Sequence, residues 1–459
     1  MKHRDHDSKP NETARRETVP SAPSIASHAA EDPGERSPRL PFASRRAFAL
    51  VLTLALLALL VLLVMALASL GHVDAQLANT AAYQVQARQN ARLALGLALG
   101  ELQRQAGPDN RVTAMAGVTG VPTGTAGNQR RHWCGVWDTA GGFQSWLVSG
   151  AAGAGPPAVV PGAKLVLLVA AGSVGAEATN SEHVAVGRMA IALADPLTDG
   201  NREQGGYAYW VGDEGVKICA YAPDATLALP GLRPVLAVTP AVALTLRTNL
   251  ATWTARLPAI LSYEQLRLLP SPGAPLTNST IWDNFHQVTL TSVSLQNQGP
   301  SVVSHSGPVN VNTTSQPVWN ALATTYNTYT ASVPISNPVT FANRMRDNLP
   351  VTGGIGKPVG GPFLSVTAFQ AGGILTTALN GLGPTPAQFL AVTAPLLTAR
   401  SDTFRVRAYG DAVNPADASQ TEAVAYAEAI VQRTPQPMDG ALGRRFVVTY
   451  FRWLGIDDI

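Results

Sequence analysis

The side chains that could carry out chemistry do not form any of the common catalytic patterns. The chain has eight histidines, of which His3, His6 and His28 lie in its polar N-terminal segment, and none belongs to a His-Glu-x-x-His pair. No Gly-x-Ser-x-Gly sequence follows an expected strand, and no Cys-x-x-Cys pair is present. The sequence therefore predicts no catalytic residue and no cofactor, and indicates a protein that is not an enzyme. It contains no metal-ligand motif and leaves metal binding open. An envelope hydrolase is kept as an alternative.

A glycine-rich segment, "GGIGKPVGG" (Gly353–Gly361), comes nearest to a phosphate-binding loop. It lacks the Lys-Ser or Lys-Thr ending of such loops, and no buried strand is expected before it. We therefore interpret this segment as a flexible loop.

The two cysteines, Cys134 and Cys219, leave two alternatives open. In an oxidising compartment they could form a disulfide, and otherwise they would be buried thiols. Their spacing in the sequence says nothing about their distance in the fold, so both alternatives stand. The aromatic-rich segments His132–Asp138 and Tyr207–Val211 could be ligand platforms. Core packing is favoured, because alternating aromatic residues in a strand share one face.

The segment "GPVNVNTTSQPVWNALA" (Gly307–Ala321) indicates an extended stretch followed by an apolar helix. Asn312 is the expected cap of that helix, because its side chain can accept a hydrogen bond from the first helical turn. Ser365 is expected to cap a second helix within Gly361–Gln370 in the same way.

The composition of the chain limits the fold classes that could hold these residues. The chain has 459 residues, and only 14% are charged, against roughly a quarter in ordinary soluble proteins. The net charge of +3 is too small to indicate nucleic-acid binding. Gly (41) and Pro (34) occur mostly in short clusters, which favours a loop-rich body with strands. The predicted fold class is α+β: a long N-terminal helix followed by a β-rich extracytoplasmic domain at 108–459 with short helices.

The N-terminal region divides into a polar and an apolar part. Residues 1–43 are rich in Ser, Pro and charge, which predicts a disordered cytoplasmic leader. Residues 44–71 are uncharged after Arg45 and Arg46, and the run is long enough for a transmembrane helix. The two arginines favour a cytoplasmic N-terminus and a single-pass protein whose body lies outside.

The helix is expected to continue as an amphipathic segment at 72–107. This stretch contains no proline, and Gly107 with Pro108 marks its end. The alternative is two helices with a break near Gly71. An apolar stripe is expected at Val73, Leu77, Ala81, Ala91, Leu95, Leu99 and Leu102.

The remaining chain alternates β-branched and aromatic residues in a way typical of strands. A β-hairpin is expected over Tyr207–Ala222, with its turn at Asp213-Glu214-Gly215. A short helix is expected at Leu261–Leu269. Further strands are expected at Lys164–Ala171, His183–Leu193, Thr403–Gly410, Glu422–Arg433 and Arg444–Leu454.

Taken together, these segments resemble a known family. The basic leader, the Phe and the long apolar helix resemble a type IV prepilin or a type II secretion pseudopilin. The stretch Gln86–Ala114 is similar to the start of the Verru_Chthon cassette protein A family, and the further matches are "YAYWVGDEGVK", "VNVNTTSQPVWNAL", "GPFLSVTAF", "SDTFRVRAYGDA", "EAIVQRTP" and "RRFVVTYFRWLGIDDI". "NVNT" also resembles a segment of K-type minor pseudopilins and their PilX-like relatives.

The resemblance implies a non-enzymatic, pilin-like structural component of a type IV pilus or type II secretion assembly. It implies an inner-membrane location with the body in the periplasm or outside the cell. The implied partners are other pilin-like or pseudopilin subunits, the inner-membrane assembly platform and a prepilin peptidase, with no nucleic acid.

Three features depart from the usual prepilin pattern. Ala47 precedes Phe48 at the expected cleavage site, where Gly is typical, and the leader is unusually long. Leu52 occupies the fifth position of the mature helix, where most major pilins carry Glu. A Glu inside the bilayer needs a charged partner. Leu52 needs none, which suits a minor subunit at a filament tip or one that never joins a filament.

The apolar run is also compatible with two other roles, a plain membrane anchor and a removable export signal. The protein could be a single-pass anchored envelope protein whose body binds a partner or a surface polymer. It could also be exported by ordinary signal peptidase, since Ala66–Ala68 resembles a small-residue cleavage site. The apolar run is longer than the roughly 7–15 residues of a removable signal, which disfavours export of this kind.

Overall fold

The computed structural model describes most of the chain after the leader. The described residues are 43–120, 130–153, 155–175, 182–194, 201–219, 282, 284–290, 293–298, 301–306, 308–329, 333–351, 353–354, 356–438 and 440–459. The leader up to residue 42 and the expected helix at Leu261–Leu269 lie outside them. The chain divides into two units, Met1–His72 and Val73–Ile459.

Helix α1 spans Ala43–Ala106, 64 residues, without a break. It contains no proline, and Ala, Leu, Gln and Arg, which are good helix formers, dominate its sequence. The expectation of one continuous helix is confirmed, and so is its end before Gly107. A break near Gly71 does not occur.

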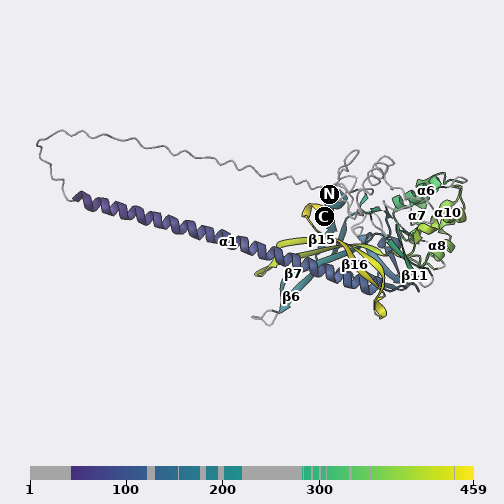
Figure 1. The fold of residues 1–459 in the computed structure, drawn as a ribbon, viewed down its shortest axis with the longest axis horizontal. Coiled ribbons are helices and arrows are strands. Elements are labelled where there is room, and N and C mark those ends of the chain that lie inside the picture. Colours follow the sequence, from purple (N-terminus) through teal and green to yellow (C-terminus); the bar gives the residue numbers. More distant parts are fainter. Residues whose placement is uncertain are drawn as a thin grey trace, which may run out of the picture. The chain divides into compact units, whose positions relative to one another are not determined.

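A five-stranded antiparallel sheet is the main element of the second unit. Its strand order is β16-β15-β14-β7-β6, so the chain crosses over between β7 and β14. Figure 1 shows the second half of α1 crossing this sheet. The strands are β6 (Met189–Ala194), β7 (Asn201–Asp213), β14 (Thr403–Asn414), β15 (Asp417–Pro437) and β16 (Arg444–Leu454).

The two faces of the central strand β14 differ in chemistry, yet both are buried. Phe404 and Val406 point toward α1, where they share a core with Ala98 and Leu102. Arg405 and Arg407 alternate with them on the other face, where both contact buried Glu428 at 3.1 and 2.9 Å. Burial alone would raise the pKa of Glu428, but Arg405, Arg407 and Arg452 together outweigh it and hold this pKa low.

Smaller sheets and short helices complete the second unit. Aromatic side chains fill the core of the helical part, which contains Trp319, Phe341 and Phe389. Figure 1 shows α6, α7, α8 and α10 gathered together. The strands are β1 (Arg111–Met115), β2 (Cys134–Asp138), β3 (Phe143–Trp146), β4 (Leu165–Val169), β5 (Val184–Gly187), β8 (Ile218–Cys219), β9 (Val288–Thr289), β10 (Val293–Gln298), β11 (Ser301–Ser306), β12 (Val309–Asn310) and β13 (Leu397–Thr398), and the helices are α2 (Ala171–Val174), α6 (Gln316–Tyr329), α7 (Pro338–Val351), α8 (Val366–Ala371), α9 (Ile374–Leu379) and α10 (Pro386–Thr393).

The predicted hairpin over Tyr207–Ala222 is wrong. The turn forms where expected, because Asp213 Oδ1 accepts a hydrogen bond from Gly215 N at 2.8 Å. The chain does not return along β7, whose two neighbours are β14 and β6. Instead β8 pairs in parallel with β9, with Ile218 opposite Val288. The long-range pairing with β14 replaces the local one.

The single strand expected at His183–Leu193 is two strands in different sheets. β5 pairs with β4, and β6 pairs with β7. Arg188 lies between them, and its guanidinium contacts Asp411 at 2.6 Å and Glu203 at 2.7 Å. Arg188, held by these two carboxylates, is therefore the residue at which the chain passes from one sheet to the other. The other expected strands match β4, β14, β15 and β16.

Candidate functional site

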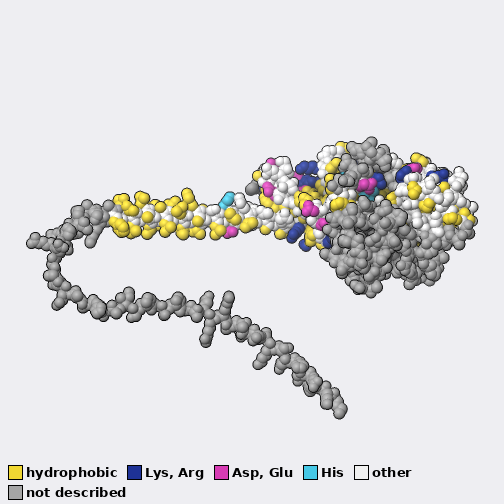
Figure 2. All heavy atoms as spheres, turned by 90° about the horizontal axis from the view of Figure 1, so that it is seen from above, with side chains coloured by type: hydrophobic (Ala, Val, Ile, Leu, Met, Phe, Trp, Pro, Cys, Tyr) yellow, Lys and Arg dark blue, Asp and Glu magenta, His cyan; other side chains and the backbone are white. Residues whose placement is uncertain are grey.

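The first half of α1 is the apolar surface that the sequence predicts. From Phe48 on, α1 is long and apolar enough to cross a membrane, with a mean hydropathy of 3.2 in its most apolar window and none of that window buried. Figure 2 shows hydrophobic side chains along the visible face of this part of the helix. Phe48 is 71% exposed and Leu52 56% exposed. Ala47 lies within the helix, which begins at Ala43. Cleavage between Ala47 and Phe48 stays a prediction.

The second half of α1 packs on the sheet through small side chains. The expected stripe is correct at Ala91 and Leu102, but Val73 and Leu77 are exposed. The fully buried side chains follow a helical spacing at Ala87, Ala91, Ala94, Ala98 and Leu102. Leu95 and Leu99 of the expected stripe are partly buried and pack against the same core, while Ala81 is exposed. Alanines make up most of the fully buried positions because the backbones of the helix and the sheet lie close together.

Gly410 of β14 shows how close the helix and the sheet lie. A Cβ atom at this position would overlap with the backbone nitrogen of Ala91 and the carbonyl oxygen of Ala87. Polar side chains of α1 fix the register, since Asn90 Nδ2 donates to Asp411 O at 2.6 Å and Gln103 Nε2 donates to Arg444 O at 2.8 Å. This half of α1 is therefore part of the folded body.

Asn312 does not cap the helix that follows it. Its Oδ1 accepts from Phe363 N at 2.7 Å, and its Nδ2 donates to Phe363 O at 3.1 Å. Helix α6 begins later, at Gln316. Asn312 is fully buried, and it joins two segments 51 residues apart. The predicted cap at Ser365 is confirmed, because its Oγ accepts from Ala368 N at 2.9 Å.

The two cysteines are both buried thiols. Cys134 lies in β2 and Cys219 in β8, which belong to different sheets. Burial raises the pKa of Cys134 well above its usual value, so its thiol is protonated and unreactive. The disulfide alternative is not the arrangement found.

Lys357, in the glycine-rich segment, points into the protein rather than toward a ligand. Its side chain is buried, and its Nζ lies 5.7 Å from the centre of the Phe363 ring. No hydrogen-bond partner of this Nζ is found within the described part of the chain. Burial lowers the pKa of Lys357 to about 8. The geometry therefore gives no support for phosphate binding by this segment.

The aromatic segments lie in a core, as expected, with Trp133 and Trp210 fully buried.

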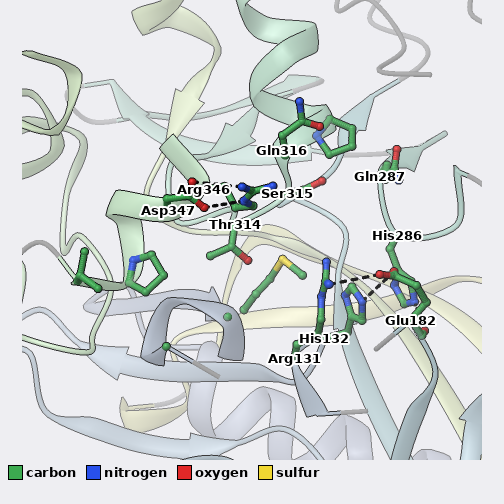
Figure 3. A pocket seen from close by; sticks show the side chains of 16 residues that line it. Arg131, His132, Glu182, His286, Gln287, Thr314, Ser315, Gln316, Arg346 and Asp347 are labelled. Atoms are coloured by element: carbon green, nitrogen blue, oxygen red, sulfur yellow. Dashed lines mark hydrogen bonds and ion pairs between the residues drawn. The ribbon is translucent and has the colours of Figure 1, made fainter. Parts of the chain in front are cut away.

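A cavity of about 710 Å³ is lined by a cluster of polar side chains. Figure 3 shows Arg131, His132, Glu182 and His286 on one side and Thr314, Ser315, Arg346 and Asp347 across from them. His132 precedes β2, Glu182 precedes β5 and His286 precedes β9. Residues from three separate segments therefore meet in one wall.

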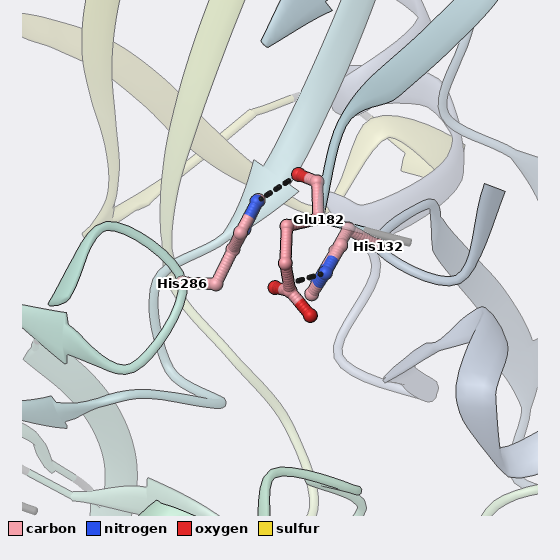
Figure 4. Close-up of side chains that lie close together, drawn as sticks. All are labelled: His132, Glu182 and His286. Atoms are coloured by element: carbon pink, nitrogen blue, oxygen red, sulfur yellow. Dashed lines mark hydrogen bonds and ion pairs between the residues drawn. The ribbon is translucent and has the colours of Figure 1, made fainter. Parts of the chain in front are cut away.

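Two histidines and one glutamate form the centre of this wall. His132 Nε2 lies 3.2 Å from Glu182 Oε2, and His286 Nε2 lies 2.8 Å from the Glu182 carbonyl oxygen. The two imidazole rings are stacked, 3.6 Å apart and 5° from parallel. Figure 4 shows the Glu182 side chain beside His132 and its backbone beside His286. Their ligand atoms lie within 4.8 Å of one another.

Burial determines the charge of the two histidines. It lowers the pKa of His132, and it lowers the pKa of His286 well below the usual value, with the neighbouring imidazole adding to the effect. Both imidazoles are therefore neutral near pH 7. The Glu182 side chain is 33% exposed, so the cluster is reached from the cavity.

No sequence pattern predicts this cluster. Glu182 is 50 residues from His132 and 104 residues from His286, so no short motif contains two of them. His132 stands in an aromatic segment that was assigned to core packing. The three residues precede strands of three different sheets, so the packing of these sheets against one another brings the side chains together.

The chain was compared with known protein families, sequences and structures. No protein-family model matches the chain, and no similar sequence was found among curated proteins. Among solved structures, the chain is similar to a chain of the GspK-GspI-GspJ complex from the type 2 secretion system of enterotoxigenic Escherichia coli, with a TM-score of 0.32 and 13% sequence identity. The match covers 58% of this chain and 84% of that chain.

Proposed function

We propose that the protein is a non-enzymatic, pseudopilin-like minor subunit of an envelope assembly, of the type IV pilus or type II secretion kind. The observation that carries this proposal is the division of α1. Its first half exposes large apolar side chains, and its second half is built into the body through Ala87, Ala91 and Gly410. Such a helix holds a folded body directly against a bilayer or against other apolar helices.

The exposed half of α1 fits helix partners of the same kind. It carries no charge from Phe48 to Gly71, so it can lie in lipid or against other apolar helices without a buried charge. Leu52 in particular needs no ionic partner in a neighbouring subunit. In this proposal the body lies outside the inner membrane, and the partners are pilin-like subunits and the assembly platform.

Site-directed photo-crosslinking in native membranes tests the proposal. A photo-reactive residue at Leu60, which is 52% exposed, is expected to crosslink to other single-span pilin-like subunits. The same residue at Arg445, an exposed position of β16, serves as the matched control. Crosslinks from Leu60 to lipid alone would favour the alternative, an anchored envelope protein whose body binds a partner or a surface polymer.

Processing is tested separately by the N-terminus of the native protein. Cleavage by a prepilin peptidase after Ala47 predicts Phe48 as the first residue in mass spectrometry. An intact Met1 would contradict processing while leaving a role as an uncut pilin-like subunit in place. A first residue near Ser69 would instead indicate ordinary signal-peptidase export and would overturn the membrane role of α1.

A further inference from the structure

We propose that His132, Glu182 and His286 form a binding site for a divalent transition-metal ion of the zinc type. This inference goes beyond the proposed function and does not depend on it. Two imidazoles and one carboxylate are a common protein ligand set for zinc, with a fourth position left for water. Magnesium and calcium prefer oxygen ligands alone, so the nitrogen atoms select against them.

The distances suit an ion held between His132 and Glu182. Two ligand atoms that each lie about 2.1 Å from a tetrahedral ion are about 3.4 Å apart. His132 Nε2 and Glu182 Oε2 are 3.2 Å apart. The ion takes the place of the proton that these two atoms share, so binding releases one proton and needs no other chemical change.

Neighbouring groups orient His286 and the Glu182 carboxylate. His286 Nε2 donates to the Glu182 carbonyl oxygen, which leaves the Nδ1 lone pair of His286 for the ion. Arg131 lies 3.3 Å from Glu182 Oε1, the carboxylate oxygen that does not face His132. A carboxylate held in this way by a second partner presents its remaining oxygen in a fixed direction.

One movement is required for binding. The His132 and His286 rings are almost parallel, so their lone pairs point along parallel lines rather than toward one ion. Within the described residues the Nδ1 of His132 has no hydrogen-bond partner, so no such bond opposes a turn of the ring about its Cβ–Cγ bond. The His286 ring is stacked 3.6 Å away and has to shift together with it. The positive charges of Arg131 and Lys217 near the rings oppose a cation, so the ligand bonds have to outweigh this repulsion.

The ion would join segments that are far apart in the sequence. Its ligands precede β2, β5 and β9, so an ion at this position cross-links three strands of the body. Binding to the folded state alone stabilises it in proportion to the logarithm of the ion concentration. The melting temperature of the body should therefore rise with added Zn²⁺.

Metal binding to the full chain in detergent tests the site. All variants carry His3→Ala, His6→Ala and His28→Ala, so that the leader histidines do not contribute. After treatment with a chelator, the protein is titrated with Zn²⁺ by calorimetry, and with Co²⁺ to record the visible absorption of a tetrahedral site. One ion per chain and a higher melting temperature are expected.

Three variants decide the outcome. Glu182→Gln and His286→Gln are expected to weaken Zn²⁺ binding by about 100-fold or more, since loss of an outer partner alone costs about 10–100-fold. His183→Gln, beside Glu182 but outside the cluster, should bind as the parent does. Glu182 is partly exposed, so its variant should fold, as checked by circular dichroism. Absence of stoichiometric binding, or binding retained in both cluster variants, would overturn the proposal.

Discussion

The two halves of α1 are both rich in Ala and Leu, yet they occupy opposite surroundings. From Phe48 to Leu70 the exposed side chains are mostly Leu and Val, while from Ala87 to Ala106 the buried ones are mostly Ala. The more hydrophobic half is the one that the body leaves uncovered. Side-chain size explains the difference, because alanines let the backbone of β14 approach the helix and larger residues would not. Hydrophobicity alone therefore does not predict which half of a long helix a protein buries.

The largest expected effect comes from filling the space between the second half of α1 and the sheet. Gly410→Val would drive side-chain atoms into the backbone of α1 at Ala87 and Ala91. We expect a loss of about 3 kcal/mol or more in the free energy of unfolding, measured by urea denaturation of the full chain in detergent. The matched control is Gly96→Val, on the exposed side of α1 with nothing within 4 Å. Equal effects of the two variants would contradict the close packing.

A charge in the first half of α1 should act on the membrane and not on the body. Leu60→Arg is expected to cost about 3 kcal/mol of membrane insertion, because arginine is unfavourable at the centre of a spanning helix. The fraction of protein in the membrane pellet measures the effect. Leu97→Arg, an exposed position in the second half, should leave that fraction unchanged. A loss from the membrane pellet that is as large for Leu97→Arg as for Leu60→Arg would contradict this division of α1.

Changes in pH should affect the body alone, since no titratable side chain lies between Phe48 and Gly71. Burial raises the pKa of Asp213 to about 6 from its ordinary 3.8. The folded state therefore holds the proton more tightly, and this contribution to stability is lost as the pH rises through about 6.

Asp213→Asn carries no titrating proton at this position. It should be more stable than the parent by roughly 2 kcal/mol at pH 7 and about equally stable near pH 4, as measured by urea denaturation. Exposed Asp347→Asn is the control. A constant difference between Asp213→Asn and the parent across this range would be inconsistent with the raised pKa.

The smallest effect is expected at a helix position without contacts. Gly100 lies in the second half of α1, and a Cβ atom there would meet nothing within 4 Å. Gly100→Ala should raise the free energy of unfolding by about 0.5–1 kcal/mol, because alanine restricts the unfolded chain and favours the helix. A shift in the denaturation midpoint measures it. A destabilised Gly100→Ala would mean that this face of α1 is covered.

Local patterns predicted much of the fold. The uninterrupted helix, its end at Gly107 and the strands around Thr403–Gly410 and Arg444–Leu454 follow from helix propensity and from alternation, which act over neighbouring residues. Asn312 and the hairpin after Tyr207 were predicted wrongly. In both cases a partner that is distant in the sequence, Phe363 or β14, replaced the local one. The cluster of His132, Glu182 and His286 was not predicted for the same reason, because its residues are far apart in the sequence.

The sequence by itself determines that this protein has one long helix, uncharged from Phe48 to Gly71, and a β-rich body. The tertiary structure alone decides which face of each element is covered. The alternation along β14 indicates one apolar and one charged face, and it does not reveal that Arg405 and Arg407 are buried with Glu428. The physical reason is that propensity and periodicity are properties of neighbouring residues. Burial and side-chain charge depend on residues brought together from distant parts of the chain.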